Sequence, residues 1–228
     1  MKGIILVFAV AVLVVASAAL PAAQQAWTED FALDKSDLSS VGTNPYFNLE
    51  PGYQLYLKSQ DGDLTITVLK QTEMVDGVET RVVEERETEG GKLIEVSRNY
   101  FAISKRTNSV FYFGEEVDMY NAKGQITGHG GSWRAGEKGN KAGLMMPGIA
   151  LIGSRYYQEV APKVAMDRAE IVSLTDTLRV PAGTFKEVLK SEETTPLEPG
   201  VKEYKYYAAG IGLLKDGDME LVRHGLVK

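Results

Sequence analysis

One of the two histidines of the chain lies in a glycine-rich stretch that could serve acyl-transfer chemistry. His129 is followed by Gly130 and Gly131, which is the pattern of the oxyanion loop in lipases and esterases. Such a loop acts beside a serine in a Gly-x-Ser-x-Gly turn, and the sequence contains no such turn. We therefore interpret residues 128–143 as a mobile crossing between two parts of a sheet.

Metal and phosphate chemistry have little support in the sequence. His129 and His224 are the only histidines, the chain has no cysteine, and no His-Glu-x-x-His pair is present. Residues 148–155 have the glycine spacing of a phosphate loop but lack its lysine. We therefore expect no metal site and no cofactor.

Carboxylates are abundant, and pairs of carboxylates can hydrolyse glycosides. They gather in the run Glu84–Glu89 and at Glu192 and Glu193, close to expected turns. We interpret these runs as solvated strand faces. The sequence thus identifies no catalytic residue, and we expect a protein that is not an enzyme. A hydrolase with a serine or carboxylate site that no motif reveals is the alternative.

Aromatic and methionine side chains offer a binding site instead. Methionines adapt to apolar ligands of different shapes, and two of them follow directly after the irregular stretch 128–143. Curved sheets often hold a pocket at one end. We expect a concavity for a lipid or another apolar small molecule, lined by Trp133, Leu144, Met145, Met146, Tyr156 and Tyr204. Ordinary packing of these side chains in the sheet is the alternative.

The first residues indicate export. Residues 3–20 form an uncharged apolar run that follows Lys2 and leads to small residues, as in a secretory signal peptide. We assign residues 1–23 to a signal helix, residues 24–43 to a flexible extension, and residues 44–228 to a single β domain in the periplasm or outside the cell. The alternative is an uncleaved anchor, because about 18 apolar residues can just span a bilayer. The protein would then meet the membrane only through this segment.

Composition limits the partners of the chain. The net charge is −6 at pH 7, so the surface repels phosphate backbones, and we expect no nucleic-acid partner. The absence of cysteine excludes a disulfide framework and a cysteine nucleophile. Stability must therefore come from the core, which a chain of 228 residues is long enough to build.

The pattern along the chain predicts a sheet. Residues 64–68 alternate apolar and polar side chains at the period of a half-buried strand. Pairs that favour tight turns recur at the spacing of long antiparallel strands, namely Asp61–Gly62, Asp76–Gly77, Gly90–Gly91, Thr107–Asn108, Lys123–Gly124 and Asp216–Gly217. We therefore predict a mainly β protein, with an antiparallel, strongly curved sheet or partly open β-barrel after the signal helix.

Three motifs are similar to those of a known group. The segments NPYF (44–47), PAGTF (181–185) and YYA-x-G-x-GL (206–213) resemble motifs of uncharacterised exported bacterial β-rich proteins. Some members of this group resemble the open barrels of periplasmic lipoprotein carriers. Members usually have proline where this chain has Asn48, a departure that affects only the first turn. The resemblance implies the fold and export, and it implies no catalytic residue.

Two functions from different classes follow from these observations. The leading hypothesis is an exported, non-enzymatic module that binds a lipid or another apolar ligand in the concavity of the sheet. The alternative is a structural or envelope protein-interaction module that uses an exposed edge strand or its acidic face. An apolar cavity inside the sheet would favour the first hypothesis, and a filled interior would favour the second.

Overall fold

The computed structural model describes residues 26–227, which are almost entirely β. The described part contains no α-helix, only the short 3₁₀-helix η1 (Lys35–Asp37). The predicted signal helix, residues 1–23, lies outside the described residues. In the part of the chain that is described, no helix has the length and apolarity to cross a membrane.

The first part of the chain supplies ten strands, of which four, β5 to β8, are long. They are β1 (Leu38–Ser39), β2 (Thr43–Asn44), β3 (Phe47–Asn48), β4 (Tyr53–Lys58), β5 (Gly62–Val75), β6 (Val78–Glu89), β7 (Lys92–Ser104), β8 (Val110–Tyr120), β9 (Ile126–Gly128) and β10 (Trp133–Arg134). Strands β5 to β8 form a meander of consecutive antiparallel neighbours, which confirms the predicted strand order in this region.

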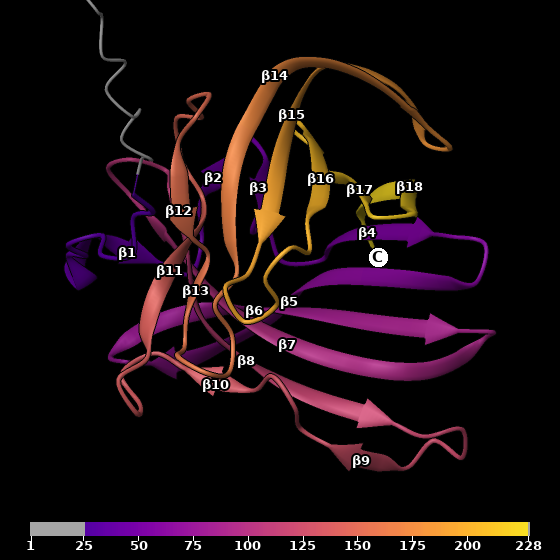
Figure 1. Cartoon of the computed structure of the whole chain (residues 1–228), viewed down its shortest axis with the longest axis horizontal. Coiled ribbons are helices and arrows are strands. Elements are labelled where there is room, and N and C mark those ends of the chain that lie inside the picture. Colours follow the sequence, from indigo (N-terminus) through magenta and orange to yellow (C-terminus); the bar gives the residue numbers. More distant parts are fainter. Residues whose placement is uncertain (1–25, 228) are drawn as a thin grey trace, which may run out of the picture.

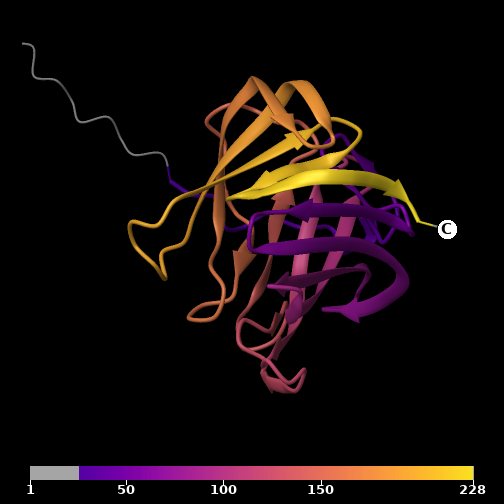
Figure 2. The same cartoon turned by 90° about the vertical axis from the view of Figure 1, so that its right-hand side faces the viewer.

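The second half supplies the remaining strands. They are β11 (Lys141–Met146), β12 (Arg155–Tyr157), β13 (Glu159–Val160), β14 (Arg168–Val180), β15 (Gly183–Thr194), β16 (Glu203–Ala208), β17 (Gly212–Asp216) and β18 (Met219–Leu226). Strand β18 pairs with β4 and thereby joins the two halves into one sheet. In Figure 2, the orange-to-yellow strands of the second half curve over the purple-to-pink strands of the first.

The sheet nearly closes into a barrel, as the sequence predicts. Its thirteen-strand path runs β12-β14-β15-β16-β17-β18-β4-β5-β6-β7-β8-β11-β13. The two ends of this path, β12 and β13, are separated in the chain by Gln158 alone. Strands β14 and β15 run steeply across Figure 1 whereas β5 to β8 run nearly level, so the strand direction turns sharply around the interior.

The predicted turns connect the long strands. Asp76–Gly77 joins β5 to β6, and Gly90–Gly91 joins β6 to β7. All four residues have positive φ angles, between 48° and 75°. Two-residue hairpin turns of this type match the twist of the flanking strands, which is why Asp-Gly and Gly-Gly pairs favour them.

Residues 26–43, assigned from the sequence to an extension, lie against the sheet. The Ser104 hydroxyl donates a hydrogen bond of 2.5 Å to the Asp37 carboxylate. The guanidinium of Arg81 donates to the Ser40 carbonyl oxygen at 3.0 Å. Phe31 packs edge-to-face on Phe111 with their ring centroids 5.9 Å apart. Buried polar contacts thus hold this segment on β6, β7 and β8.

Residues 128–143 are more ordered than the glycine content suggests. Strand β10 lies within them and pairs with β8, and the side chain of Trp133 is buried. The pairing brings the backbones very close, because a Cβ at Gly114 would lie 2.4 Å from the Trp133 carbonyl oxygen. Glycine in this part of β8 therefore serves a close approach of two strands.

Candidate functional site

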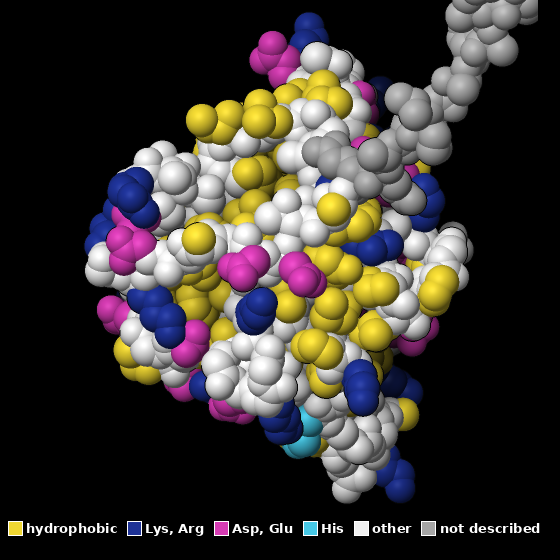
Figure 3. Space-filling view, turned by 60° about the vertical axis from the view of Figure 1, so that its left-hand side comes forward, with side chains coloured by type: hydrophobic (Ala, Val, Ile, Leu, Met, Phe, Trp, Pro, Cys, Tyr) yellow, Lys and Arg dark blue, Asp and Glu magenta, His cyan; other side chains and the backbone are white. Residues whose placement is uncertain are grey.

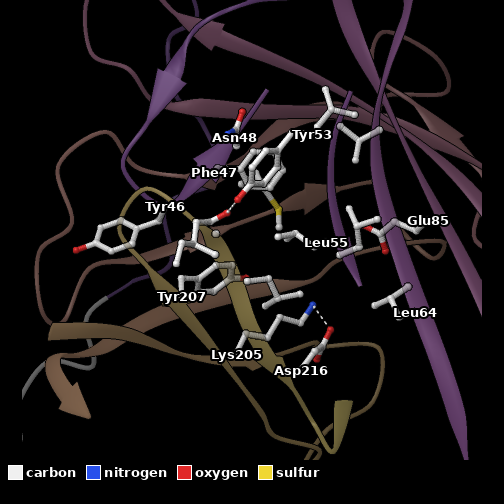
Figure 4. A pocket seen from close by; sticks show the side chains of 17 residues that line it. Tyr46, Phe47, Asn48, Tyr53, Leu55, Leu64, Glu85, Lys205, Tyr207 and Asp216 are labelled. Atoms are coloured by element: carbon white, nitrogen blue, oxygen red, sulfur yellow. Dashed lines mark hydrogen bonds and ion pairs between the residues drawn. The ribbon is translucent and has the colours of Figure 1, made fainter. Parts of the chain in front are cut away.

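The interior of the barrel holds a small apolar cavity of about 80 Å³. It is lined mainly by aromatic and aliphatic side chains of β3 to β6 and β16 to β17, which Figure 4 shows converging on one space. We call it the apolar cavity; its apolar lining includes Tyr46, Phe47, Tyr53, Leu55, Leu64, Ile66, Val68, Val83, Met145, Tyr207, Ile211 and Leu213. Glu85, Lys205 and Asp216 form its polar edge.

A second cavity, of about 190 Å³, continues from this polar edge. It shares Glu85, Met145 and Lys205 with the apolar cavity, so the two adjoin. We call it the acidic cavity because six carboxyl groups line it, those of Glu85, Glu95, Glu115, Glu159, Asp167 and Glu193. Lys205 is the only basic side chain in its lining.

A third cavity, of about 250 Å³, leads from the acidic cavity toward the surface. It shares Asp167, Glu193 and Lys205 with the acidic cavity, and its remaining lining comes from the ends of β15 and β16 and the loop that joins them. Glu198 and Val201 of that loop are exposed to solvent. We call this space the outer cavity; it gives the interior an acidic connection to the outside.

Lys205 lies between two carboxylates at the junction of the three cavities. Its Nζ lies 3.1 Å from Glu193 Oε2 and 3.3 Å from Asp216 Oδ2. Burial alone would lower the pKa of this lysine, but the attraction of Glu193 and Asp216 outweighs it and raises the pKa well above its ordinary value. Lys205 is therefore charged, and its charge is matched by these two partners.

The other carboxyl groups of the acidic cavity have no cation of their own. Burial, reinforced by neighbouring carboxylates, raises the pKa of Glu85 to about 7 and that of Glu159 well above its ordinary value. Burial raises the pKa of Glu115 to about 7 as well, against a hydrogen bond from Tyr112 that lowers it. These groups therefore bind protons near neutral pH that an exposed glutamate would release.

Hydrogen bonds hold part of the acidic lining in place. The Tyr112 hydroxyl, buried in the sheet, bonds both Asn99 Oδ1 and Glu115 Oε2, the latter at 3.1 Å. The indole Nε1 of Trp133 donates to Glu159 Oε1 at 3.4 Å. Glu85, Glu95 and Asp167 differ: across residues 26–227, no hydrogen bond or ion pair reaches their carboxylates. The acidic cavity thus combines three bonded carboxyl groups with three that can take a partner, and of these only Glu85 also lines the apolar cavity.

Two tyrosines of the apolar cavity contrast in the same way. Tyr53 donates its hydroxyl to the Ile211 carbonyl oxygen at 3.1 Å and lies 3.3 Å from His224 Nδ1. Tyr207 is only 3% exposed, yet no described residue forms a hydrogen bond with its hydroxyl. Every fully buried polar side-chain atom of the described residues has a partner, so the unbonded Tyr207 hydroxyl keeps contact with the open space of the cavity, where a ligand or water can bond it.

The site residues expected from the sequence fall in different places. Met145 lines both the apolar and the acidic cavity. Trp133 supports Glu159 from behind, and Tyr156 and Met146 are buried in the core. Leu144 is half-buried. The apolar cavity is lined by none of Leu144, Trp133, Tyr156 and Met146. Tyr204 is 38% exposed, bonds Glu192, and lies under the ammonium of Lys190.

The carboxylates of β6 were interpreted from the sequence as a solvated face, and only half of them fit that description. Glu84 forms outward ion pairs with Arg86 and Arg98. Glu85 lines the two inner cavities, and burial raises the pKa of Glu87 as well. Alternation along a strand requires these two sets to face opposite sides, which is the signal that could have separated them.

Comparisons of the chain with models of protein families, with characterised proteins and with solved structures find no match. The resemblance to exported bacterial β-rich proteins therefore stays a prediction. A function must be argued from the three adjoining cavities and from the groups that line them.

Proposed function

We propose that the protein is an exported, non-enzymatic binding module that holds a small amphipathic molecule with a positively charged head group. The continuity of an apolar cavity with an acidic one supports this proposal most directly. The apolar group of the ligand would occupy the space between Tyr53 and Tyr207, and its head group would lie beside Glu85. The apolar part of the ligand would then meet apolar walls, and its charged part would meet acidic walls, within one continuous space.

The apolar cavity sets a size limit on the ligand. Its volume of about 80 Å³ is roughly half that of an engineered cavity of about 150 Å³ that binds benzene. It therefore suits a short alkyl or small branched group and not a long acyl chain. The lining is aromatic and aliphatic on most sides, so a short apolar group gains contact as well as release from water.

The acidic cavity sets the charge of the head group. Six carboxyl groups line it, and the single cation, Lys205, is already matched by Glu193 and Asp216. An anionic head group would meet further carboxylates in a partly buried space and would be repelled. A protonated amine would allow Glu85 and Glu115 to ionise, because an opposite charge nearby favours the carboxylate.

The free hydroxyl of Tyr207 adds direction to the site. It lies in a wall that also contains Lys205 and Asp216, at the edge between apolar and acidic surroundings. A polar atom of the ligand next to its alkyl group can accept or donate a hydrogen bond there. The carboxylates then select a ligand with a positive charge. The tyrosine selects a ligand that also carries a polar atom at a fixed distance from that charge.

Straight-chain amines of three to eight carbons test the proposal by isothermal titration of the purified full-length protein. Amines should bind at least ten-fold more tightly than carboxylates and alcohols of the same length, with an optimum at short chains. Binding should also release protons, so the measured enthalpy should depend on the ionisation enthalpy of the buffer. Equal affinity for amines and carboxylates, or no binding of any compound at millimolar concentration, would contradict the proposal.

A matched pair of substitutions locates the binding. Ile66 lines the apolar cavity, whereas Ile126 lies on β9 with 51% of its surface exposed. Ile66→Phe should fill the cavity and weaken amine binding at least ten-fold, and Ile126→Phe should leave it unchanged. Mass spectrometry of the recovered ligand completes the test, because a ligand that returns with a changed mass would favour a hydrolase over a binding module.

A further inference from the structure

The loop between β11 and β12 presents three aliphatic side chains to solvent. Ile149, Leu151 and Ile152 are 78%, 63% and 64% exposed, the largest exposed fractions of any large hydrophobic side chains in residues 26–227. Single exposed aliphatic residues are common on soluble proteins, but a contiguous group marks a surface that meets another apolar phase. Nothing in the proposed ligand site uses these residues.

The loop is fixed at both ends, so its apolar tip is presented and not folded back onto the sheet. At its start, the side chain of Asn44 donates to the Pro147 carbonyl oxygen at 3.1 Å, and the Gly148 amide donates to Ser109 Oγ at 3.1 Å. At its end, the Gly153 amide donates to the Ile171 carbonyl oxygen at 2.8 Å. Figure 3, in which the side that carries β12 comes forward, shows uncovered apolar side chains on this face.

The N-terminal part of the chain leaves the barrel at the same end as this loop. Thr28 bridges Tyr156 in parallel, with hydrogen bonds from Thr28 N to Arg155 O at 3.0 Å and from Tyr157 N to Thr28 O at 2.8 Å. In a parallel pair, the residues that precede each segment extend from the same end. The chain before Trp27 and the loop before Arg155 therefore share one end of β12.

The sequence before Trp27 contains the apolar run described above. The uncharged apolar run, residues 3–20, is joined to Trp27 by residues 21–26, which can span at most ~20 Å. Trp27 is held between Arg155 and Arg168, with their guanidinium carbons 5.5 Å and 4.4 Å from its ring centroid.

We propose that the loop 147–154 docks on a phospholipid bilayer and inserts Ile149, Leu151 and Ile152 into its interfacial region. Trp27 and the two arginines then lie at the level of the head groups, where tryptophan and basic side chains are favoured. A projecting loop suits a fluid surface better than a second copy of the chain, because a stable dimer buries about 800 Å² of each partner in a complementary face.

The absence of cysteine from the chain allows a clean test with single nitroxide labels. Leu151→Cys carries the label on the loop, and Ile126→Cys carries it on β9, at the other side of the molecule in Figure 1. The labelled full-length chains are bound to vesicles of phosphatidylethanolamine and phosphatidylglycerol. Collision of the label at 151 with a water-soluble nickel chelate should fall at least five-fold on the vesicles, and collision of the label at 126 should not change.

Two outcomes of this experiment would contradict the proposal. If the label at 151 stays as accessible as that at 126 while the chain is on the vesicles, the apolar run alone holds the protein there and the proposal fails. If the label at 151 becomes protected in solution without vesicles and in proportion to protein concentration, a second copy covers the loop and the proposal also fails.

A second variant separates insertion from folding. Ile149→Asp with Ile152→Asp places charges on the loop on both sides of the label at 151. The label should then regain its accessibility on vesicles, because a charged side chain opposes insertion. The thermal unfolding midpoint should stay within about 2 °C of the parent, since both side chains are mostly exposed. Retained protection of the label in this variant would overturn the proposal.

Discussion

Gly143 and Gln158 touch through their backbones, and this contact lies where the sheet closes. A Cβ at Gly143 would lie 2.2 Å from the carbonyl oxygen of Gln158 and 2.8 Å from the amide nitrogen of Glu159. Gly143 belongs to β11, and Gln158 is the single residue between the two terminal strands β12 and β13. Where the barrel is nearly closed, strand β11 thus packs directly against the residue between the two ends of the sheet.

Gly143→Ala should consequently destabilise the closure. The added methyl group meets backbone atoms and not a flexible side chain, so the strands must separate, at a cost of roughly 1–3 kcal/mol in the free energy of unfolding. Gly130→Ala is the matched control, because nothing lies within 4 Å of a Cβ there. Urea unfolding followed by circular dichroism measures both. Equal stability of the two variants would show that the contact at Gln158 is unimportant.

The raised pKa values of the interior carboxyl groups make stability depend on pH. Glu85 and Glu115 have an ordinary value of 4.5 and a folded-state pKa of about 7. Between these values the folded protein keeps protons that the unfolded chain has released, so the free energy of unfolding falls as pH rises from 4.5 to 7. A pKa difference of one is worth about 1.4 kcal/mol, so the fall should be roughly 3 kcal/mol for each group, and it should end above pH 7.

Substitution of one of these groups identifies the source of that dependence. Glu85→Gln should raise stability at pH 8, where the parent carries a buried carboxylate, and should change it little at pH 5. Glu84→Gln is the control on the same strand, because Glu84 pairs with Arg86 and Arg98 on the outer face. Urea unfolding at both pH values measures the two variants. An unchanged slope in Glu85→Gln would assign the dependence to other groups.

Much of the barrel follows from local sequence signals, and its closure does not. Asp76–Gly77 and Gly90–Gly91 fix hairpins because few other residues accept their positive φ angles. The pairing of β18 with β4 and the contact of Gly143 with Gln158 join residues far apart in the chain. Such pairings depend on the twist and bending of every strand between them, and no short window of sequence contains that information.

The sequence did not predict the acidic lining of the interior, for a related reason. In β6, both faces carry charged residues, so period-two alternation of apolar and polar side chains is lost after Val83. Alternation puts Glu84, which faces Arg98, and Glu85, which lines the cavities, on opposite faces, but no local signal shows which of the two faces is the interior. Of the expected ligand residues, Met145 lines the apolar cavity from β11, a strand of the barrel wall, whereas Tyr204 lies on the outer side of β16.

Tyr207→Phe should separate a binding role from a structural one. No residue within 26–227 bonds the hydroxyl, so its removal should leave stability unchanged or raise it by up to about 1 kcal/mol. The same change should weaken binding of short amines several-fold. Tyr53→Phe is the contrasting variant, because it breaks a bond to Ile211 and should lower stability by about 1 kcal/mol. Equal losses of stability in the two variants would mean that Tyr207 also has a structural partner.

Lys205→Met should show how far the acidic interior depends on one cation. The Lys205 side chain is 24% exposed and its ammonium neutralises Glu193 and Asp216, so its loss leaves two carboxylates without a cation beside the other acids of the cavity. Removal of one partner from such a buried set costs about 3 kcal/mol or more. The loss should be smaller at pH 5, where the remaining carboxyl groups take up protons in place of the lysine charge.

Lys215→Met provides the matched comparison on the neighbouring strand β17. Its Nζ lies 2.6 Å from Glu220 Oε1 in a similarly exposed pair, but it has one partner and lines none of the three interior cavities. Its removal should cost at most about 1 kcal/mol and should be nearly independent of pH. Similar losses for both lysines at pH 8 would place the interior carboxyl groups in well-hydrated surroundings. The charge selection proposed for the ligand would then lose its physical basis, because solvated carboxylates discriminate weakly between an amine and a neutral head group.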